Sequence, residues 1–264
     1  MGRLDGLVAA VVGGGQTPGA TLGNGRATAL RFAQEGAMVV VLDRRLDSAE
    51  ETVTMIEAEG GRGKALQLDV TSEGQCAACI AKVISEFGVL DILHNNVGIG
   101  TGDAGPGRIS EEVWDRIFDT NTKSVMFMCK AVLPHMRERK TGVITNISSV
   151  AAIAAASNIT AYKSSKAALN AYTQALAMSN ARFGIRANVI MPGLIETPMA
   201  IEGYVAAGQD REDVISRRNA AVPLGKMGTA WDVANAALFL ASAEAGFITG
   251  VALPVDGGQS AKVG

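Results

Sequence analysis

The sequence has few of the residues that build disulfide-linked or metal-binding proteins. Its 264 residues include three cysteines and two histidines, and three cysteines are too few for a disulfide framework in such a chain. Cys76 and Cys79 form a C-x-x-C pair, but they lie within a helical pattern at 71–87 without a second pair, whereas a zinc site needs further ligands. We interpret both cysteines as small apolar helix residues, interpret His94 and His135 as structural, and predict no metal site.

Long hydrophobic runs and an excess of one charge are also absent. No apolar stretch reaches the roughly 18 residues that a membrane span needs, and the apolar run near the N-terminus is too short for the core of a signal peptide. The formal net charge is −2, whereas surfaces that bind nucleic acids are basic. We therefore expect a cytoplasmic protein whose partner is neither a membrane nor a nucleic acid.

What the sequence does contain is an alternation of strand-like and helix-like segments. The strand-like runs lie at 7–12, 37–43, 64–69, 90–95, 142–148, 185–191 and 251–255. They are apolar on both faces, which is typical of a parallel sheet covered on both sides. Amphipathic helical patterns lie between them, for example at 25–36, 48–60 and 160–184. The alternation predicts one α/β domain over 1–264, with a doubly wound, seven-stranded parallel sheet flanked by helices on both faces. The least regular segment, 198–220, is predicted to be a mobile loop.

The connection after the first strand is rich in glycine. It runs from Gly13 through Asn24 to Gly25, directly follows the strand and opens a helix. Glycines at such a place let the backbone turn sharply and approach a pyrophosphate, whose charge is stabilised by the free N–H groups of the next helix. Ordinary turns are also rich in glycine, so it is the strand-to-helix context that predicts a dinucleotide site.

Asp43 ends the second predicted strand, 18 residues after Gly25. A carboxylate at this place can accept hydrogen bonds from both ribose hydroxyls of an adenosine and repels a 2′-phosphate, which favours NAD over NADP. Arg44 and Arg45 follow directly, and a cation beside the ribose attracts the phosphate instead. An alternative role for Asp43 is to place a negative charge near the start of the next helix.

Tyr162 and Lys166 are the clearest candidates for chemistry. They are four residues apart in a helical pattern, so both side chains project from one face. A phenol has a pKa of about 10; a neighbouring ammonium and the positive nicotinamide ring both lower that pKa, so that Tyr162 can exchange a proton with an alcohol or a ketone. Ser149 ends the fifth predicted strand, and its hydroxyl can hold the substrate oxygen. Tyr-x-x-x-Lys alone is common in helices, but the combination indicates hydride transfer.

In combination, these residues resemble the short-chain dehydrogenase/reductase family, whose single-domain members have the Rossmann-type fold. The resemblance covers essentially the whole chain. It is carried by the glycine loop, Asp43, Asp69-Val70, Asn95-Asn96-Val97-Gly98, Asn121, Ser149, Tyr162 with Lys166, Pro192-Gly193 and Asp256-Gly257-Gly258.

The resemblance implies further roles. Asn121 would help to hold a water that links Lys166 to solvent, Lys166 would also bind ribose, and Asp69 and Val70 would contact adenine. Other positions implied to contact the cofactor are Asn95 and Gly98 in one turn, and Pro192, Gly193, Ile195 and Thr197 in a loop that closes on the nicotinamide. Similar proteins are usually homotetramers that pair through two long helices, here at 112–139 and 160–183, and through the last strand.

The sequence departs from the family pattern in the glycine loop. Val12 replaces the usual Thr, and the gap from Gly13 to Gly23 is six residues longer than usual. Gly19 restores the usual spacing to the later glycines, but it lies well past the strand end, so we take Gly13 as the first glycine of an expanded loop. Val97 stands where Ala is usual.

We therefore predict a reversible, NAD(H)-dependent oxidation of a secondary alcohol. Tyr162 would be the acid/base, and 198–220 would cover a medium-sized, partly apolar substrate such as a hydroxylated ring. One alternative is an NADPH-dependent 3-oxoacyl-carrier-protein reductase, which Asp43 disfavours. The other is a non-catalytic dinucleotide-binding protein, which would have no need of the set formed by Ser149, Tyr162 and Lys166.

Overall fold

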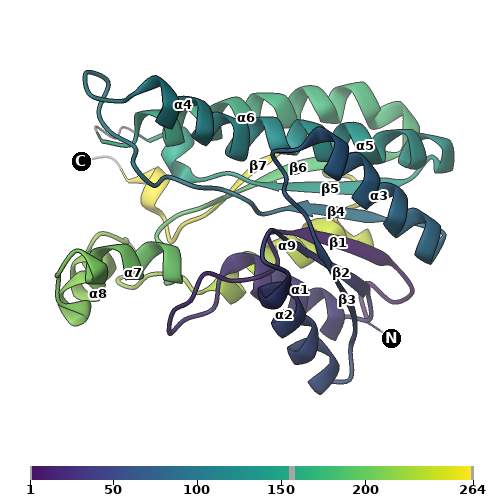
Figure 1. Ribbon diagram of the computed structural model, residues 1–264, viewed down its shortest axis with the longest axis horizontal. Helices are drawn as coiled ribbons and strands as arrows, with labels where there is room; N and C mark the ends of the chain where they lie inside the picture. Colours follow the sequence, from purple (N-terminus) through teal and green to yellow (C-terminus); the bar gives the residue numbers. More distant parts are fainter. Residues whose placement is uncertain (1, 155–157, 263–264) are drawn as a thin grey trace.

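Seven parallel strands form a single sheet in the computed structural model, which describes residues 2–154 and 158–262 (Figure 1). The strands are β1 (Val8–Val12), β2 (Met38–Asp43), β3 (Arg62–Gln67), β4 (Ile92–Asn95), β5 (Gly142–Ile147), β6 (Ile185–Pro192) and β7 (Ala252–Val255). Their spatial order is β3-β2-β1-β4-β5-β6-β7. The predicted doubly wound sheet is confirmed, and no strand end differs from its predicted position by more than two residues.

Helices cover both faces of the sheet and bury one apolar layer on each side (Figure 1). One face is covered by α3 (Glu73–Phe87), α5 (Ser124–Arg139) and α6 (Thr160–Asn180), and the other by α1 (Asn24–Gln34), α2 (Leu46–Ala58) and α9 (Ala230–Ala241). A short helix, α4 (Glu111–Phe118), lies against α6. Among the described residues, no helix combines the length and the apolar character needed to cross a bilayer.

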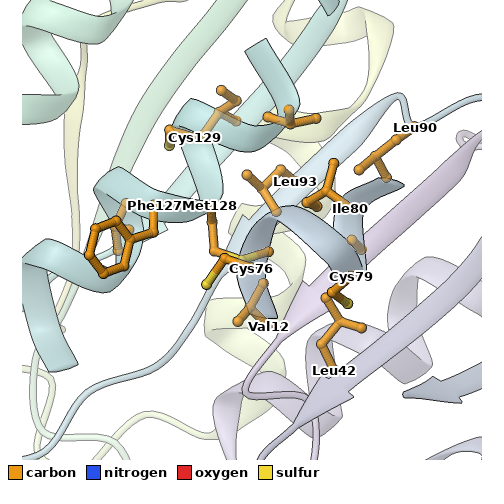
Figure 2. Close-up of a cluster of buried hydrophobic side chains, with 14 of the residues drawn as sticks. Val12, Leu42, Cys76, Cys79, Ile80, Leu90, Leu93, Phe127, Met128 and Cys129 are labelled. Atoms are coloured by element: carbon orange, nitrogen blue, oxygen red, sulfur yellow. The ribbon is translucent and has the colours of Figure 1, made fainter. Parts of the chain in front are cut away.

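The cysteine pair belongs to one of these apolar layers. Cys76 and Cys79 are buried within α3, and Figure 2 shows them beside Val12 and Leu42 of the sheet. Burial raises the pKa of both thiols to about 11, so neither is a thiolate near neutral pH. The interpretation of the pair as apolar helix residues is confirmed.

Both histidines also have structural roles. His94 is fully buried on β4 with its ring edge-on to Phe32, and the ring centroids are 5.9 Å apart. The Nε2 atom of His135, in α5, accepts a hydrogen bond from the backbone N–H of Leu90 at 3.2 Å. Each side chain therefore supports the packing of a strand end or a helix.

The chain order reverses between β1 and β4, because β1 pairs with β2 on one side and with β4 on the other. In doubly wound sheets, ligands bind outside the carboxyl ends of the strands at this reversal. The connections that leave β1 to β6 all start at this edge of the sheet, and the predicted site residues lie in these connections or at the strand ends that precede them.

The prediction of an irregular loop at 198–220 is wrong. This segment forms two helices, α7 (Pro198–Ala206) and α8 (Arg211–Ala220), which lie together at one end of the molecule (Figure 1). Ile201 and Val214 bury their side chains between the two helices and Met227. Asp210 caps α8, because its side chain accepts hydrogen bonds from the backbone N–H groups of Glu212 and Asp213. Because only a few apolar side chains pack between these two helices, the helical periodicity of the sequence at 198–220 is weak.

Candidate active site

Gly13 and Gly25, at the two ends of the loop, allow the backbone after β1 to contact the backbone at the start of α1. Gly13 has a φ of 74°, in the left-handed region, and a Cβ atom on Gly25 would collide with the carbonyl oxygen of Gly13. Asn96 fixes the same carbonyl by donating a hydrogen bond from Nδ2 at 3.3 Å. The start of α1 is thereby held directly beyond β1, and its first amides are available to an anion. This cradle fits a pyrophosphate, as the glycine pattern predicts.

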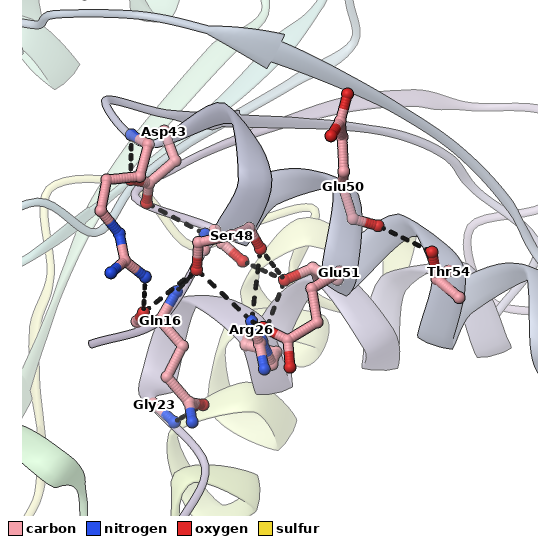
Figure 3. A network of polar contacts seen from close by, with 12 residues as sticks. Gln16, Gly23, Arg26, Asp43, Ser48, Glu50, Glu51 and Thr54 are labelled. Carbon is pink, nitrogen blue, oxygen red and sulfur yellow. Dashed lines mark hydrogen bonds and ion pairs between the residues drawn. The ribbon is translucent and has the colours of Figure 1, made fainter. Parts of the chain in front are cut away.

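The expanded part of the loop is attached to α2 through Gln16, which hydrogen-bonds with Ser48 (Figure 3). The N–H of Gln16 donates to Ser48 Oγ at 2.7 Å, and its Oε1 accepts the N–H of Gly23 at 2.8 Å. Gly19 lies against α7, where an added Cβ would be 2.8 Å from a side-chain carbon of Pro198. Gly13, and not Gly19, is therefore the glycine under α1.

A buried arginine that the sequence analysis missed ties α1 to α2. Arg26 is 4 % exposed, donates to Thr52 Oγ1 at 2.9 Å and pairs with Glu51 at 2.6 Å. This hydrogen bond and the positive charge lower the pKa of the Glu51 carboxyl. Thr52 in turn donates to the carbonyl of Gly14 at 2.9 Å. The network in Figure 3 thus attaches the glycine loop to α1 and α2. Its contacts join residues far apart in the chain, so no periodic pattern in the sequence predicts them.

Asp43 lies at the carboxyl end of β2, beside the glycine loop. Its Oδ2 accepts the N–H of Gly15 at 3.1 Å, and its Oδ1 accepts the N–H of Arg45 at 3.0 Å. A carboxylate has about four acceptor positions, so both oxygens retain capacity for ribose hydroxyls. The guanidinium of Arg45 donates to the carbonyl of Gln16 at 2.7 Å, so this cation is hydrogen-bonded to the glycine loop.

Tyr162 and Lys166 lie on α6 and face the end of β5. Lys166 is 2 % exposed, and its Nζ donates to the carbonyl of Ile147 at 2.9 Å and to that of Val97 at 3.5 Å. The same Nζ lies 5.9 Å from the centroid of the Tyr162 ring. Ser149 follows β5 and forms a hydrogen bond with the Tyr162 phenol. The structure therefore brings the three predicted catalytic residues together.

The protein's own groups raise the pKa of the Tyr162 phenol, so Lys166 alone does not produce the expected lowering. Burial raises the pKa of Tyr162, and the hydrogen bond with Ser149 acts in the opposite direction without reversing the effect. Burial also lowers the pKa of Lys166 to about 8. Desolvation thus disfavours the charged form of both groups in the protein alone, and a lower phenol pKa requires a further positive charge in the cleft.

Asn121 occupies a π-helical turn, Asp119–Lys123, between α4 and α5. Its side-chain amide pairs with the backbone of Ile99: Oδ1 accepts the N–H at 2.7 Å, and Nδ2 donates to the carbonyl at 2.9 Å. Nδ2 also donates to Ser165 Oγ at 3.0 Å. Asn121 therefore joins the turn after β4 to the helix that carries Tyr162 and Lys166.

The turn after β4 leaves no room for a side chain at Gly98, since a Cβ there would lie 2.8 Å from Lys166 Nζ. The side chain of Asn95 does not face this turn. It is 3 % exposed and donates to Asn146 Oδ1 at 2.8 Å, and Asn146 donates to Thr173 Oγ1 at 2.9 Å. The expected contact of Asn95 with a cofactor is therefore not supported for its side chain, which packs between the sheet and α6.

Asp69 and Val70 follow β3 at the carboxyl edge of the sheet. The carboxylate of Asp69 accepts hydrogen bonds from the N–H and the hydroxyl of Thr71, at 2.9 and 2.7 Å, and these bonds lower its pKa. The side chain of Val70 is 8 % exposed and belongs to the apolar layer beneath α3. Both positions are fixed by local structure before any adenine binds.

The end of β6 at Pro192 leads into a segment that contains Gly193, Ile195 and Thr197, and this segment is held from two sides. A Cβ on Gly193 would collide with Gln259 and Asp256, and Gln259 Oε1 accepts the N–H of Leu194 at 2.7 Å. On the other side Ile195 forms a parallel bridge with Gly228. Thr197 then precedes α7. The contribution of Gln259 and Gly228 was missed, because long-range pairing leaves no local signal.

Comparisons with known proteins agree with this geometry. Residues 19–260 match a family model described as enoyl-(acyl carrier protein) reductase. The chain is 38 % identical over 246 residues to 2-(R)-hydroxypropyl-CoM dehydrogenase of Xanthobacter autotrophicus, which covers 92 % of this chain and 96 % of that one. It is also 38 % identical to 3-oxoacyl-(acyl-carrier-protein) reductase of Thermotoga maritima, over 97 % of this chain and 98 % of the relative.

A crystal structure described as a short-chain dehydrogenase/reductase from Burkholderia xenovorans superposes with a TM-score of 0.96 at 38 % identity, covering both chains completely. The chain belongs to the short-chain dehydrogenase/reductase family. It is an oxidoreductase that acts on CH–OH groups, and the resemblance inferred from the motifs is confirmed.

Two departures from the short-chain dehydrogenase/reductase pattern have defined places in the structure. The extra loop residues are anchored through Gln16 to α2 and contact α7 through Gly19. Val97 packs against the glycine loop, with its Cγ2 3.0 Å from the position of a Cβ on Gly13. Neither departure displaces Lys166 or Asn121 from the turn after β4.

Proposed function

We propose that the protein interconverts a secondary alcohol and a ketone with NAD(H), and that Tyr162 exchanges the proton. The observation that carries this proposal is the placement of Lys166, which is buried on two backbone carbonyls with its Nζ 5.9 Å from the Tyr162 ring. NAD supplies the hydride acceptor in oxidation, and its reduced form supplies the hydride in the reverse direction.

Each of the four side chains then has a defined role. In oxidation the Tyr162 oxygen takes the hydroxyl proton of the alcohol, and in reduction it returns a proton to the ketone oxygen. Ser149 donates a hydrogen bond to the substrate oxygen and holds it beside the phenol. The ammonium of Lys166 favours the phenolate and binds ribose. Asn121 keeps the turn at 98–99 in place and supports a water path from Lys166 to solvent.

NAD is the proposed cofactor because the ribose side of the cleft offers the carboxylate of Asp43, and because one of the two arginines that follow it, Arg45, is already hydrogen-bonded to the glycine loop. Asp43 faces this place, and Arg45 donates to the carbonyl of Gln16 at 2.7 Å. A 2′-phosphate would have to compete with that hydrogen bond and would meet the negative charge of Asp43. We expect kcat/KM to be at least about tenfold higher with NAD than with NADP, which steady-state assays with both cofactors measure.

We propose that α7 and α8 cover the substrate. Met199 and Tyr204 on α7 are 62 % and 40 % exposed, and Ile153, in the segment after Ser149, is 58 % exposed. Such side chains suit a medium-sized, partly apolar substrate such as a hydroxylated ring. We further propose a cytoplasmic homotetramer that pairs through α4–α5, α6 and β7.

The decisive experiment is an assay of a panel of secondary alcohols (2-butanol, cyclopentanol, cyclohexanol and 1-phenylethanol), read by the absorbance of reduced nicotinamide. Tyr162→Phe should reduce kcat by about 10²- to 10⁴-fold, because it removes the proton-transferring oxygen. Full turnover by Tyr162→Phe would reject the assignment. A faster reaction of acetoacetyl thioesters with NADPH would instead favour a 3-oxoacyl-carrier-protein reductase, the activity named for the Thermotoga maritima relative.

A further inference from the structure

The helix that carries Tyr162 starts without a cap of its own. α6 begins at Thr160, and the preceding residue, Ile159, has a hydrocarbon side chain that cannot accept a hydrogen bond. The first amides of a helix have no acceptor within the helix. Tyr162 is the third residue of α6, so its own N–H is one of these amides. The position of the proton-transferring residue therefore depends on an acceptor from elsewhere in the chain.

Asp103 supplies that acceptor from the loop that follows β4. Its Oδ2 accepts the N–H of Tyr162 at 2.7 Å, and its Oδ1 accepts the N–H of Ala161 at 3.1 Å. The same Oδ1 accepts the N–H of Ala104 at 2.7 Å, and the carbonyl of Ala104 accepts the N–H of Thr160 at 3.2 Å. The first three amides of α6 are thus all bound by two consecutive residues, which lie 56 or more positions earlier in the chain.

We propose that Asp103 is a positioning residue for proton transfer, which places the Tyr162 phenol against Ser149 and Lys166. This inference rests on the proposed function. Lys166 and Ser149 have separate attachments: Lys166 donates to the carbonyl of Ile147 at 2.9 Å, and Ser149 Oγ accepts the N–H of Ala151 at 3.1 Å. Tyr162 belongs to the first turn of α6, and a first turn without a cap frays. Loss of Asp103 therefore moves one catalytic residue relative to two that stay in place.

The same loop also contacts the ring of Tyr162. A Cβ atom added to Gly100 would lie 3.4 Å from Cδ2 of the ring, and the preceding Ile99 is held by both amide atoms of Asn121. The loop after β4 is therefore fixed at Ile99 by Asn121, lies beside the phenol ring at Gly100, and holds the backbone of Tyr162 at Asp103. An ionised carboxylate makes a stronger bond to N–H groups than a neutral acceptor does, which suits a charged residue at this place.

The test compares Asp103→Ala and Asp103→Asn with a matched control, Asp91→Ala. Asp91 is also a carboxylate that binds a distant backbone amide, because its Oδ2 accepts the N–H of Val8 at 2.9 Å. Asp91 lies at the amino ends of β1 and β4, on the opposite edge of the sheet from Tyr162. Hydrogen exchange of the peptide containing Ala161 and Tyr162, steady-state kinetics with NAD and cyclohexanol, and thermal unfolding are measured for each protein.

We expect Asp103→Ala to speed exchange at Ala161 and Tyr162 and to lower kcat by about 10- to 100-fold, since small misplacements of reacting groups have effects of this size. The KM for NAD should stay within about twofold, because the expected change is in orientation and not in cofactor binding. Asp103→Asn keeps one acceptor oxygen and should lose less kcat than Asp103→Ala. Asp91→Ala should lower Tm but keep kcat within about twofold.

The inference is overturned if Asp103→Ala exchanges faster at Tyr162 but keeps the kcat of the unchanged protein. It is also overturned if both Asp103 variants lose no more kcat than Asp91→Ala at an equal loss of Tm, because Asp103 would then be a cap for stability alone. Asp103→Asn decides the matter if Asp103→Ala does not fold. The proposed function fails separately, by full turnover in Tyr162→Phe or by absence of turnover across the alcohol panel.

Discussion

Lys166 shows how burial and charge oppose each other at one residue. Its ammonium is 2 % exposed, and burial lowers its pKa to about 8 from an ordinary 10.5. Holding this group protonated at neutral pH costs about 3 kcal/mol, since one pKa unit corresponds to about 1.4 kcal/mol. The two carbonyls of Ile147 and Val97 that accept its hydrogen bonds recover part of that cost.

We predict that Lys166→Met changes Tm by only a few degrees while lowering kcat by about 10²- to 10⁴-fold. The substitution removes the cost of burying the Lys166 ammonium. It also leaves the carbonyls of Ile147 and Val97 without a donor, which costs about 1–3 kcal/mol for each unsatisfied group. Thermal unfolding and turnover of the variant measure the two effects separately. A loss of stability as large as that of a core truncation would contradict this balance.

His94 makes a second prediction at the residue scale. Burial lowers its pKa to about 3, and its ring nitrogens have no hydrogen-bond partner among the described residues. Between about pH 6.5 and 3 the unfolded chain binds a proton that the folded chain does not, so stability falls as the pH falls through this window.

At pH 5 this effect amounts to about 2 kcal/mol. Denaturant unfolding at pH 7 and pH 5 should therefore show a smaller loss of stability for His94→Leu than for the unchanged protein. The comparison uses the difference between the two pH values within each protein, so a general effect of the substitution on stability cancels. Equal losses in both proteins would show that His94 titrates normally.

At the scale of elements, the sequence predicts what local patterns encode and misses what depends on distant contacts. Apolar runs located all seven strands, and the four-residue spacing placed Tyr162 and Lys166 on one helical face. The segment 112–139 reads as one helix, but the structure inserts a π-helical turn that carries Asn121. Such a turn depends on the Ile99 and Ser165 contacts of Asn121, and these come from other parts of the chain.

The α7–α8 pair supports a prediction at this scale. Asp210 accepts hydrogen bonds from the N–H groups of Glu212 at 2.9 Å and of Asp213 at 3.0 Å, and α8 holds α7 through the ion pair of Arg211 with Glu202. We expect Asp210→Ala to loosen α8, since loss of an N-cap costs about 1 kcal/mol.

If α7 and α8 cover the substrate, Asp210→Ala should raise the KM for the alcohol several-fold and leave the KM for NAD unchanged. Ser72→Ala, which removes the cap of α3, controls for the loss of a cap elsewhere. An unchanged KM for every alcohol of the panel would argue that the two helices do not cover the substrate.

At the scale of the molecule, the doubly wound order places the site residues at the carboxyl edge of the sheet, as the family resemblance implies. Which side chains face the cleft is a different matter. Asn95 matches the family motif but donates its hydrogen bond to Asn146 on the covered face of the sheet, and Asp103 lies outside every motif but caps the catalytic helix. Motif spacing identifies a position in the fold, whereas the partner of a side chain is decided by the packing of distant segments.

The outer surface supports a prediction about assembly. Met178 on α6 is 65 % exposed, and Phe247 before β7 is fully exposed. Large apolar side chains on the surface mark interaction sites when they gather, and the proposed tetramer would cover both. We expect Met178→Glu to give a smaller assembly in light scattering after size exclusion. Met199→Glu alters an equally exposed residue of α7 and should leave the assembly unchanged.

The added stretch of the glycine loop lies between the start of α1 and the start of α7 and contacts both. Gly19 lies against Pro198 at the start of α7, and Glu202 Oε1 would be 3.0 Å from a Cβ at the same glycine. If α7 covers the substrate as proposed, an outward movement of α7 that releases the product must separate these surfaces and so disturb the loop that leads to Gly23 and the first turn of α1. Shortening this stretch would therefore be expected to affect the release of the substrate and of the cofactor together.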